Sequence, residues 1–174
     1  MSTRRLFLAI WPEEVQVDQL FALQGKYTAW GRQVIPENFH VTLLFLGEVD
    51  DDALQCLIQN ISSVTFEPFR ISLEKLGYFD KTKIFWVGPN ETPIELESLF
   101  KKLRNCAIRC GFSKLTKRYA PHVTLLRKAE VPITDPNFTA IEWQVNDFHL
   151  VESHMDRDGA HYATIKSFPH TIAR

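Results

Sequence analysis

The pentapeptide His-Val-Thr-Leu-Leu occurs twice in this 174-residue chain, at positions 40–44 and again at positions 122–126. In each copy a histidine stands two residues before a threonine, and side chains two residues apart in a β-strand point to the same face. Each copy is therefore expected to place an imidazole beside a hydroxyl, His40 beside Thr42 and His122 beside Thr124. Two such pairs facing each other would form a symmetric acid–base site.

Two histidines that flank one substrate can divide the work of acid–base catalysis, because an imidazole with an ordinary pKa of about 6.5 can be neutral or protonated near neutrality. This arrangement suits in-line displacement at phosphorus. One histidine takes a proton from the attacking water, and the other gives a proton to the leaving oxygen. The threonine hydroxyls can donate hydrogen bonds to the non-bridging oxygens, where charge builds up. The scheme uses no metal ion and no other cofactor, and the sequence carries no HExxH motif, Walker loop or G-x-S-x-G elbow.

The elements that must position these residues are also duplicated. An aromatic-rich strand at Leu6–Trp11 and a helix that begins at Pro12 precede the first pentapeptide. A strand at Ile84–Gly88 and a helix that begins near Pro93 precede the second. The repeated order of strand, helix and motif strand predicts an α+β fold of two pseudo-symmetric lobes. Each lobe is expected to be an antiparallel sheet with helices on its outer face, and the active site should lie in the cleft between the lobes. We expect residues 1–174 to form one two-lobed domain with this internal duplication.

The other elements follow from periodicity and turn residues. Strands are predicted at Phe69–Leu76, Glu142–Val151 and Tyr162–Lys166, the last two joined by a turn at Asp158-Gly159, and two prolines mark a loop before them. Three helices are predicted from apolar residues at helical spacing: Val17, Leu20 and Phe21 in the first; Leu54, Leu57, Ile58 and Ile61 in the second; and positions from Leu96 to Cys110 in the third. Asp50–Asp52 should cap the second helix, and Gly111 should end the third. The loop prolines are Pro132 and Pro136.

The composition, with 45% hydrophobic and 24% charged residues, is that of an ordinary globular protein. The sequence has no run of 18 apolar residues, so we expect no membrane association through a spanning helix. A net charge of −1 gives no overall nucleic-acid signature. However, the segment from Lys101 to Lys128 holds nine basic residues and no acidic one. Within it, Lys117 and Arg118 lie just before the second motif and are candidates for holding phosphate.

The three cysteines are Cys56, Cys106 and Cys110. An odd number without the spacing of a disulfide framework indicates a reducing compartment and buried structural thiols. Cys106 and Cys110 lie four residues apart and could flank a metal ion, but no nearby histidine or acidic residue completes a tetrahedral set. We therefore expect free cysteines, no metal site and a cytoplasmic location.

The two motifs and their flanks resemble those of a known family, the two-histidine phosphoesterases. Within that family the chain is most similar to the bacterial and archaeal RNA 2′,3′-cyclic phosphodiesterases, first described as 2′-5′ RNA ligases. The resemblance covers nearly the whole chain. It rests on Arg5–Ile10, on Pro36–Val49, on Tyr119–Arg127, and on the late pattern Ser153, Gly159 and Tyr162. One departure is the run Lys117-Arg118-Tyr119-Ala120, where the family often has phenylalanine shortly before the second Pro-His.

The resemblance implies hydrolysis of an RNA or nucleotide 2′,3′-cyclic phosphate end to a 2′-phosphomonoester. By correspondence, His40 would be the general acid and His122 the general base, with Thr42 and Thr124 holding the phosphate. Arg127 matches a family position, but it follows His122 by five residues, so only a bulge or a strand end could turn it toward the site. The resemblance also allows a slow ATP-independent reverse reaction that joins RNA ends through a 2′-5′ linkage. We expect a monomer.

Two other readings stay open from the residues. The same chemistry could act on a small nucleotide or another non-RNA cyclic phosphate. Alternatively, the same pocket could belong to a non-catalytic module that binds RNA ends. Phe45 and Trp30 could stack on a base or pack in the core. The histidines outside the motifs are expected to be surface or structural residues: His149, His154, His161 and His170.

Overall fold

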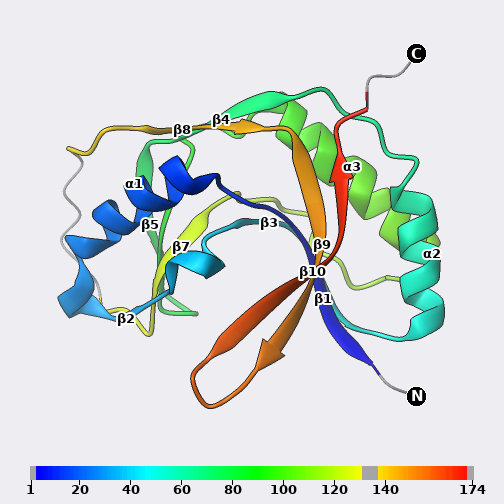
Figure 1. Cartoon of the computed structure of the whole chain (residues 1–174), viewed down its shortest axis with the longest axis horizontal. Helices are drawn as coiled ribbons and strands as arrows, with labels where there is room; N and C mark the ends of the chain where they lie inside the picture. Colours follow the sequence, from blue (N-terminus) through cyan, green and yellow to red (C-terminus); the bar gives the residue numbers. More distant parts are fainter. Residues whose placement is uncertain (1–2, 131–136, 172–174) are drawn as a thin grey trace.

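A computed structural model of the chain describes residues 3–130 and 137–171 (Figure 1). Within these residues three α-helices interrupt a succession of strands, and two 3-10 helices, η1 and η2, lie between α1 and β3. The elements are β1 (Arg4–Ile10), α1 (Glu14–Gly25), η1 (Thr28–Trp30), β2 (Arg32–Gln33), η2 (Pro36–Asn38), β3 (Val41–Val49), α2 (Asp51–Ile61), β4 (Phe69–Leu73), β5 (Lys75–Phe79), β6 (Ile84–Gly88), α3 (Ile94–Arg109), β7 (Val123–Arg127), β8 (Ile141–Val145), β9 (Asp147–Met155) and β10 (Ala160–Pro169).

The predicted α+β fold is confirmed. The strand order of the main sheet is β10-β9-β1-β3-β7-β6-β5, with β2 added to β7, and neighbouring strands pair antiparallel. The two motif strands, β3 and β7, lie at its centre. Within the described residues they pair at a single position, Val41 with Val123. This seam divides the sheet into two halves, one carrying each histidine motif.

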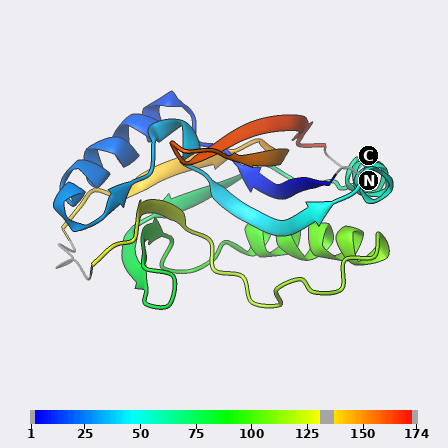
Figure 2. The same cartoon turned by 90° about the horizontal axis from the view of Figure 1, so that it is seen from below.

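The helices cross between the two halves. Helix α1, from the first half of the chain, contacts β7, and α3, from the second half, contacts β3. Figure 2 shows α3 running alongside β3. Each motif strand is thus supported by the helix that belongs to the other copy of the repeat.

Helix α1 buries part of the stripe that its sequence predicts. Leu20 is buried and Val17 is partly buried, but Phe21 is 52% exposed. Leu23 and Gln24 are also buried. The amide of Gln24 donates hydrogen bonds of 2.8 Å to the carbonyl oxygens of Val34 and Leu125, so a polar residue takes a core position by satisfying two strand-edge carbonyls.

The predicted ends of the other helices are confirmed. The Asp50 carboxylate caps α2 by accepting a 2.8 Å hydrogen bond from the Ala53 amide. Helix α3 follows Pro93, and Gly111 comes after its end with a φ of +91°, a conformation that glycine adopts without strain. The predicted turn at Asp158-Gly159 also forms, with the Asp156 carboxylate accepting hydrogen bonds from both amides.

Two of the predicted strands are each divided in the structure. Residues 69–76 form β4 and part of β5, and residues 142–151 form β8 and part of β9. The breaks lie at Glu74 and Asn146, where the chain passes from a two-stranded sheet, β4 with β8, into the main sheet. The pattern of apolar residues along one strand does not indicate such a change of pairing partner. The loop predicted at Pro132 and Pro136 lies outside the described residues.

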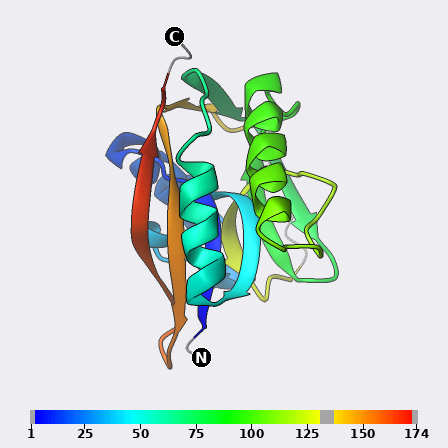
Figure 3. The ribbon, with the colours of Figure 1, turned by 90° about the vertical axis from the view of Figure 1, so that its right-hand side faces the viewer.

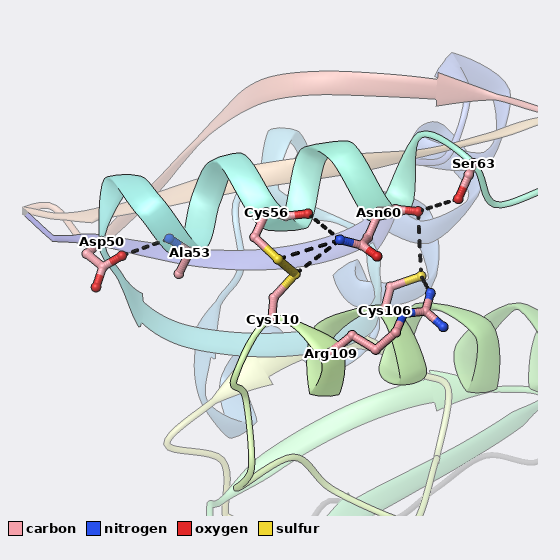
Figure 4. The surroundings of a disulfide bond; sticks show 8 residues. All are labelled: Asp50, Ala53, Cys56, Asn60, Ser63, Cys106, Arg109 and Cys110. Atoms are coloured by element: carbon pink, nitrogen blue, oxygen red, sulfur yellow. Dashed lines mark hydrogen bonds between the residues drawn. A yellow bond between two sulfur atoms is a disulfide. The ribbon is translucent and has the colours of Figure 1, made fainter.

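The prediction of free cysteines is wrong for two of the three. Cys56 on α2 forms a disulfide with Cys110 at the end of α3, while Cys106 is free and buried (Figure 4). The Asn60 amide lies 3.5 Å from both bridged sulfurs. The two helices lie side by side (Figure 3), and this packing brings together cysteines separated by 54 residues of sequence. The cysteine count therefore gives no indication of a reducing compartment.

Candidate active site

The two motifs meet at the seam of the sheet. Each histidine immediately precedes its strand, and the antiparallel pair Val41–Val123 sets the register between them. In such a pair, position 40 faces position 124 and position 42 faces position 122. Each histidine thus lies beside the threonine of its own motif and across from the threonine of the other.

Both imidazoles are anchored in the same way. The Nδ1–H of His40 donates a 2.7 Å hydrogen bond to the Asn38 carbonyl, and the Nδ1–H of His122 donates one of the same length to the Ala120 carbonyl. In each case the acceptor lies two residues earlier in the chain. A neutral ring that donates from Nδ1 has its lone pair at Nε2. The Nε2 of His40 accepts a 3.0 Å hydrogen bond from the Thr42 hydroxyl.

Aromatic side chains surround the two histidines. The sequence indicates some of them: Tyr162 belongs to the late family pattern, and Trp11 and Trp86 lie in the aromatic-rich strands that precede the two helices. The ring centroids around His40 are those of Phe7 at 5.1 Å, Trp11 at 5.3 Å and Tyr162 at 5.2 Å, and those around His122 are Phe79 at 4.9 Å and Trp86 at 5.9 Å.

This environment disfavours the charged form of both rings. Burial is the largest cause that lowers the pKa of His40 to about 4, and the positive charges of Arg127 and His122 add to it, although the Asn38 carbonyl opposes the shift. Burial, followed by Arg127, also lowers the pKa of His122. Both histidines are therefore neutral near pH 7 in the free protein. A bound phosphate anion would favour protonation.

A bulge in β7 turns Arg127 toward the site. The sequence predicts that Arg127 can reach the site only through a bulge or a strand end. On β7, Thr124 pairs with Trp86 while Leu126 pairs with Phe85, so Leu125 is an extra residue in the strand. The extra residue restores Arg127 to the face that carries Thr124. Arg127 lines the cavity described below.

The first motif strand carries an equivalent bulge. Thr42 pairs with Ala9 while Leu44 pairs with Leu8, so the extra residue lies at position 43. Phe45 is consequently turned to the face of Thr42. It lines the cavity and is 50% exposed, so it does not pack in the core.

A cavity of about 640 Å³ lies over this face of the sheet. His40, both threonines and Arg127 line it, and His122 lies outside its lining, against Phe79 and Trp86. Two walls complete it, one from the segment around β2 and η2 and one from the β9–β10 hairpin, which projects from the body in Figure 1. The other lining residues are Arg5 and Phe7 on β1; Phe45 on β3; Arg32, Gln33, Val34, Ile35 and Asn38 around β2 and η2; and Ser153, Met155, Asp158, Gly159, Ala160, His161 and Tyr162 in the hairpin.

Several sequence candidates lie elsewhere. Lys117 and Arg118 are exposed and do not line the cavity. Trp30 is 38% exposed and also lies outside the lining. Among the histidines outside the motifs that the structure describes, His161 alone lines the cavity. Residues 3–130 and 137–171 contain no group of three His, Cys, Asp or Glu side chains able to hold a metal ion, and none of their helices is long and apolar enough to cross a membrane.

Comparison with protein families gives two matches to one model, described as LigT-like phosphoesterase, over residues 10–86 and 87–162. The two matches coincide with the two copies of the repeat. Among curated proteins, the chain is 30% identical over 168 residues to the RNA 2′,3′-cyclic phosphodiesterase of Escherichia coli, with 94% of each chain covered. It is 32% identical to the protein of the same name from Thermus thermophilus, with 94% of this chain and 89% of the relative covered.

Solved structures agree with these matches. E. coli LigT in its apo form superposes with a TM-score of 0.91 at 30% identity, over 99% of this chain and all of that one. The complex of E. coli LigT with 3′-AMP superposes with a TM-score of 0.91 at 29% identity, over 98% of this chain. The similarity therefore extends across both lobes and the cleft between them.

Proposed function

This chain belongs to the LigT-like phosphoesterase family and is an enzyme of that family, and from this premise we propose that it is an RNA 2′,3′-cyclic phosphodiesterase. It would open a terminal 2′,3′-cyclic phosphate to a 2′-phosphomonoester. The observation that carries the proposal is the matched anchoring of the two histidines at one seam. Each ring donates from Nδ1 to a backbone carbonyl and keeps Nε2 for proton transfer.

In the proposed reaction, His122 acts as the general base and His40 as the general acid. A water molecule attacks phosphorus opposite the 3′ oxygen, and Nε2 of His122 takes a proton from that water. The bond between phosphorus and the 3′ oxygen breaks as Nε2 of His40 gives its proton to the leaving oxygen. After the reaction His122 has gained a proton and His40 has lost one, and proton exchange with solvent restores both histidines.

The phosphate would be held by Thr42, Thr124 and Arg127. The hydroxyls donate to non-bridging oxygens, and the guanidinium faces the negative charge that grows on them. The substrate anion has a second role. Because both rings are partly buried and neutral in the free protein, the anion is needed to raise the pKa of His40 so that it carries a proton.

The cavity supports RNA as the substrate class. It extends well beyond the phosphate site, to Arg5 and Arg32 on two different strands, and these cations can face further backbone phosphates. A small cyclic nucleotide would use only part of this surface. Reverse 2′-5′ joining of RNA ends uses the same proton transfers in the opposite order and needs no ATP.

We first place the reaction in the cytoplasm, where RNA is abundant. We then infer that the protein acts as a monomer, because one chain supplies both histidines. Size-exclusion chromatography with light scattering should give the chain mass of 20.2 kDa. A dimer mass would contradict the second inference. Detection of the native protein in a secreted fraction would contradict the first.

Product analysis with adenosine 2′,3′-cyclic phosphate tests the function. We expect the 2′-monophosphate from the unmodified protein and no turnover by His40→Ala or His122→Ala with the fold intact. Full activity in either variant would refute the acid–base pair. Saturable binding of the cyclic phosphate without turnover would instead identify a module that binds RNA ends. Comparison of turnover of an RNA oligomer with that of the mononucleotide separates an RNA enzyme from one for small nucleotides.

A further inference from the structure

The buried side chain of Gln24 on α1 contacts the bulge that turns Arg127 toward the cleft. Its Nε2 donates a 2.8 Å hydrogen bond to the carbonyl oxygen of Leu125, which is the extra residue of that bulge. Arg127 follows two residues later on the same strand. We propose that Gln24 positions the phosphate-binding Arg127 by holding this bulge in place. This inference rests on the proposed function, in which Arg127 holds the phosphate.

The direction of the Arg127 side chain depends on the bulge. Thr124 pairs with Trp86 and Leu126 pairs with Phe85, so the register leaves Leu125 without a partner on β6. In a regular strand, residues three apart point to opposite faces, and Arg127 would then face away from Thr124 and the cavity. Whatever keeps Leu125 out of the β6 ladder therefore keeps the guanidinium at the site.

Two hydrogen bonds hold Leu125 from the side opposite β6. Its carbonyl accepts one of 3.1 Å from the Val34 amide, besides the one of 2.8 Å from Gln24. Val34 directly follows β2, which pairs with β7 at Arg32 and Arg127. The carbonyl of the bulge is thus fixed to α1 and to the segment after β2 at once.

The second donor of the Gln24 amide binds that same segment. It donates a 2.8 Å hydrogen bond to the Val34 carbonyl, so both N–H groups of one side chain are used, one on the motif strand and one on the cavity wall. An apolar residue of the same size would fill the space but leave the buried Leu125 carbonyl with one hydrogen bond fewer. The need for a donor explains why a polar residue occupies this core position.

The same helix provides a matched control. Gln16 is partly buried on α1, and its Nε2 donates a 3.0 Å hydrogen bond to the Glu142 carbonyl on β8. Neither Gln16 nor Glu142 lines the cavity. Replacement of either glutamine by methionine keeps an unbranched side chain of similar size and removes its donor. The two replacements differ in the strand that loses the hydrogen bond.

The test measures the dissociation constant for inorganic phosphate by NMR titration. Gln24→Met should raise it about five- to fiftyfold, whereas Gln16→Met should leave it within about twofold of the unmodified protein. In an Arg127→Met background, Gln24→Met should raise it no further than about twofold, because the residue it positions is absent. Equal weakening by Gln24→Met in both backgrounds, or none in either, would overturn the proposal.

A measurement on the unmodified protein keeps the test decisive if Gln24→Met fails to fold. The side-chain amide resonances of Gln24 should shift when phosphate binds and should stay in place in Arg127→Met, and those of Gln16 should not shift in either protein. Absence of the Gln24 shift would overturn the proposal. Phosphate binding that is coupled to Gln24, without turnover of adenosine 2′,3′-cyclic phosphate, would overturn the proposed reaction and leave the role of Gln24 standing.

Discussion

The low pKa of His40 is open to direct measurement. Its ordinary value of 6.5 is lowered to about 4, mainly by burial among Phe7, Trp11 and Tyr162. A difference of 2.5 units (6.5 − 4) corresponds to about 3 kcal/mol at about 1.36 kcal/mol per unit. Because pH 7 lies 3 units above a pKa of about 4, about one molecule in a thousand carries a proton on His40 at pH 7 when no ligand is bound.

The low pKa of His40 makes the stability of the folded protein depend on pH, because the folded and unfolded chains bind a proton at His40 over different pH ranges. The unfolded chain binds a proton at His40 below about pH 6.5, but the folded chain does so only below about pH 4. Stability is therefore fully present above pH 6.5 and is lost as the pH falls through this window. Urea unfolding between pH 7 and pH 4 should show the free energy of unfolding fall by about 3 kcal/mol from His40, and His40→Gln should lack this part of the slope.

The same titration can be followed by NMR from the ring proton of His40. We expect a midpoint near pH 4, which should rise when inorganic phosphate binds. Arg127→Met should also raise the midpoint, but by less than the full 2.5 units, because burial is the larger cause. A midpoint near 6.5 in the unmodified protein, with parallel unfolding curves for His40→Gln, would refute the argument that this environment keeps the ring neutral.

Two further predictions concern residues that hold the site together. The Tyr119 hydroxyl donates a 3.2 Å hydrogen bond to the Thr42 carbonyl, and burial raises the pKa of this phenol so that it remains a donor. Tyr119→Phe should lower kcat about two- to tenfold. Tyr78→Phe removes a similar bond, to the Ala129 carbonyl after the end of β7, and should leave kcat unchanged. Equal kcat in both variants would contradict this. Reduction of the Cys56–Cys110 disulfide should lower the free energy of unfolding by about 4 kcal/mol, because the bridge closes a loop between cysteines 54 residues apart. Cys56→Ser should match the reduced protein in chemical denaturation. The same free energy of unfolding with and without reductant would show that the bridge contributes nothing.

The sequence was informative where a local rule governs the structure. The cap at Asp50, the stop at Gly111 and the turn at Gly159 depend on a few neighbouring residues, and each formed as expected. The duplicated motif also predicted that the two histidine strands meet. The local pattern was incomplete for α1: Leu20 is buried as expected, but Gln24 also takes a core position because its partners come from other elements.

Other features depend on contacts that no local pattern encodes. The pairing of Cys56 with Cys110 follows from the packing of α2 on α3, and the division of two predicted strands follows from a change of sheet at Glu74 and Asn146. The two bulges also depend on pairing between strands. The sequence shows that Arg127 can reach the site only with a bulge, but the equivalent bulge that exposes Phe45 becomes visible only in the strand register.

The strand order also has a consequence for the time at which the enzyme becomes complete. β1, at the start of the chain, pairs with β9 at residues 147–155, and β9 pairs with β10. A chain emerging from the ribosome therefore contains both motif histidines well before it contains the strand that closes the first half-sheet and the Tyr162 ring that packs on His40. Pairings over such long separations are slow to form, because loop closure must precede them. The two motif histidines are thus translated before the strands that complete their surroundings.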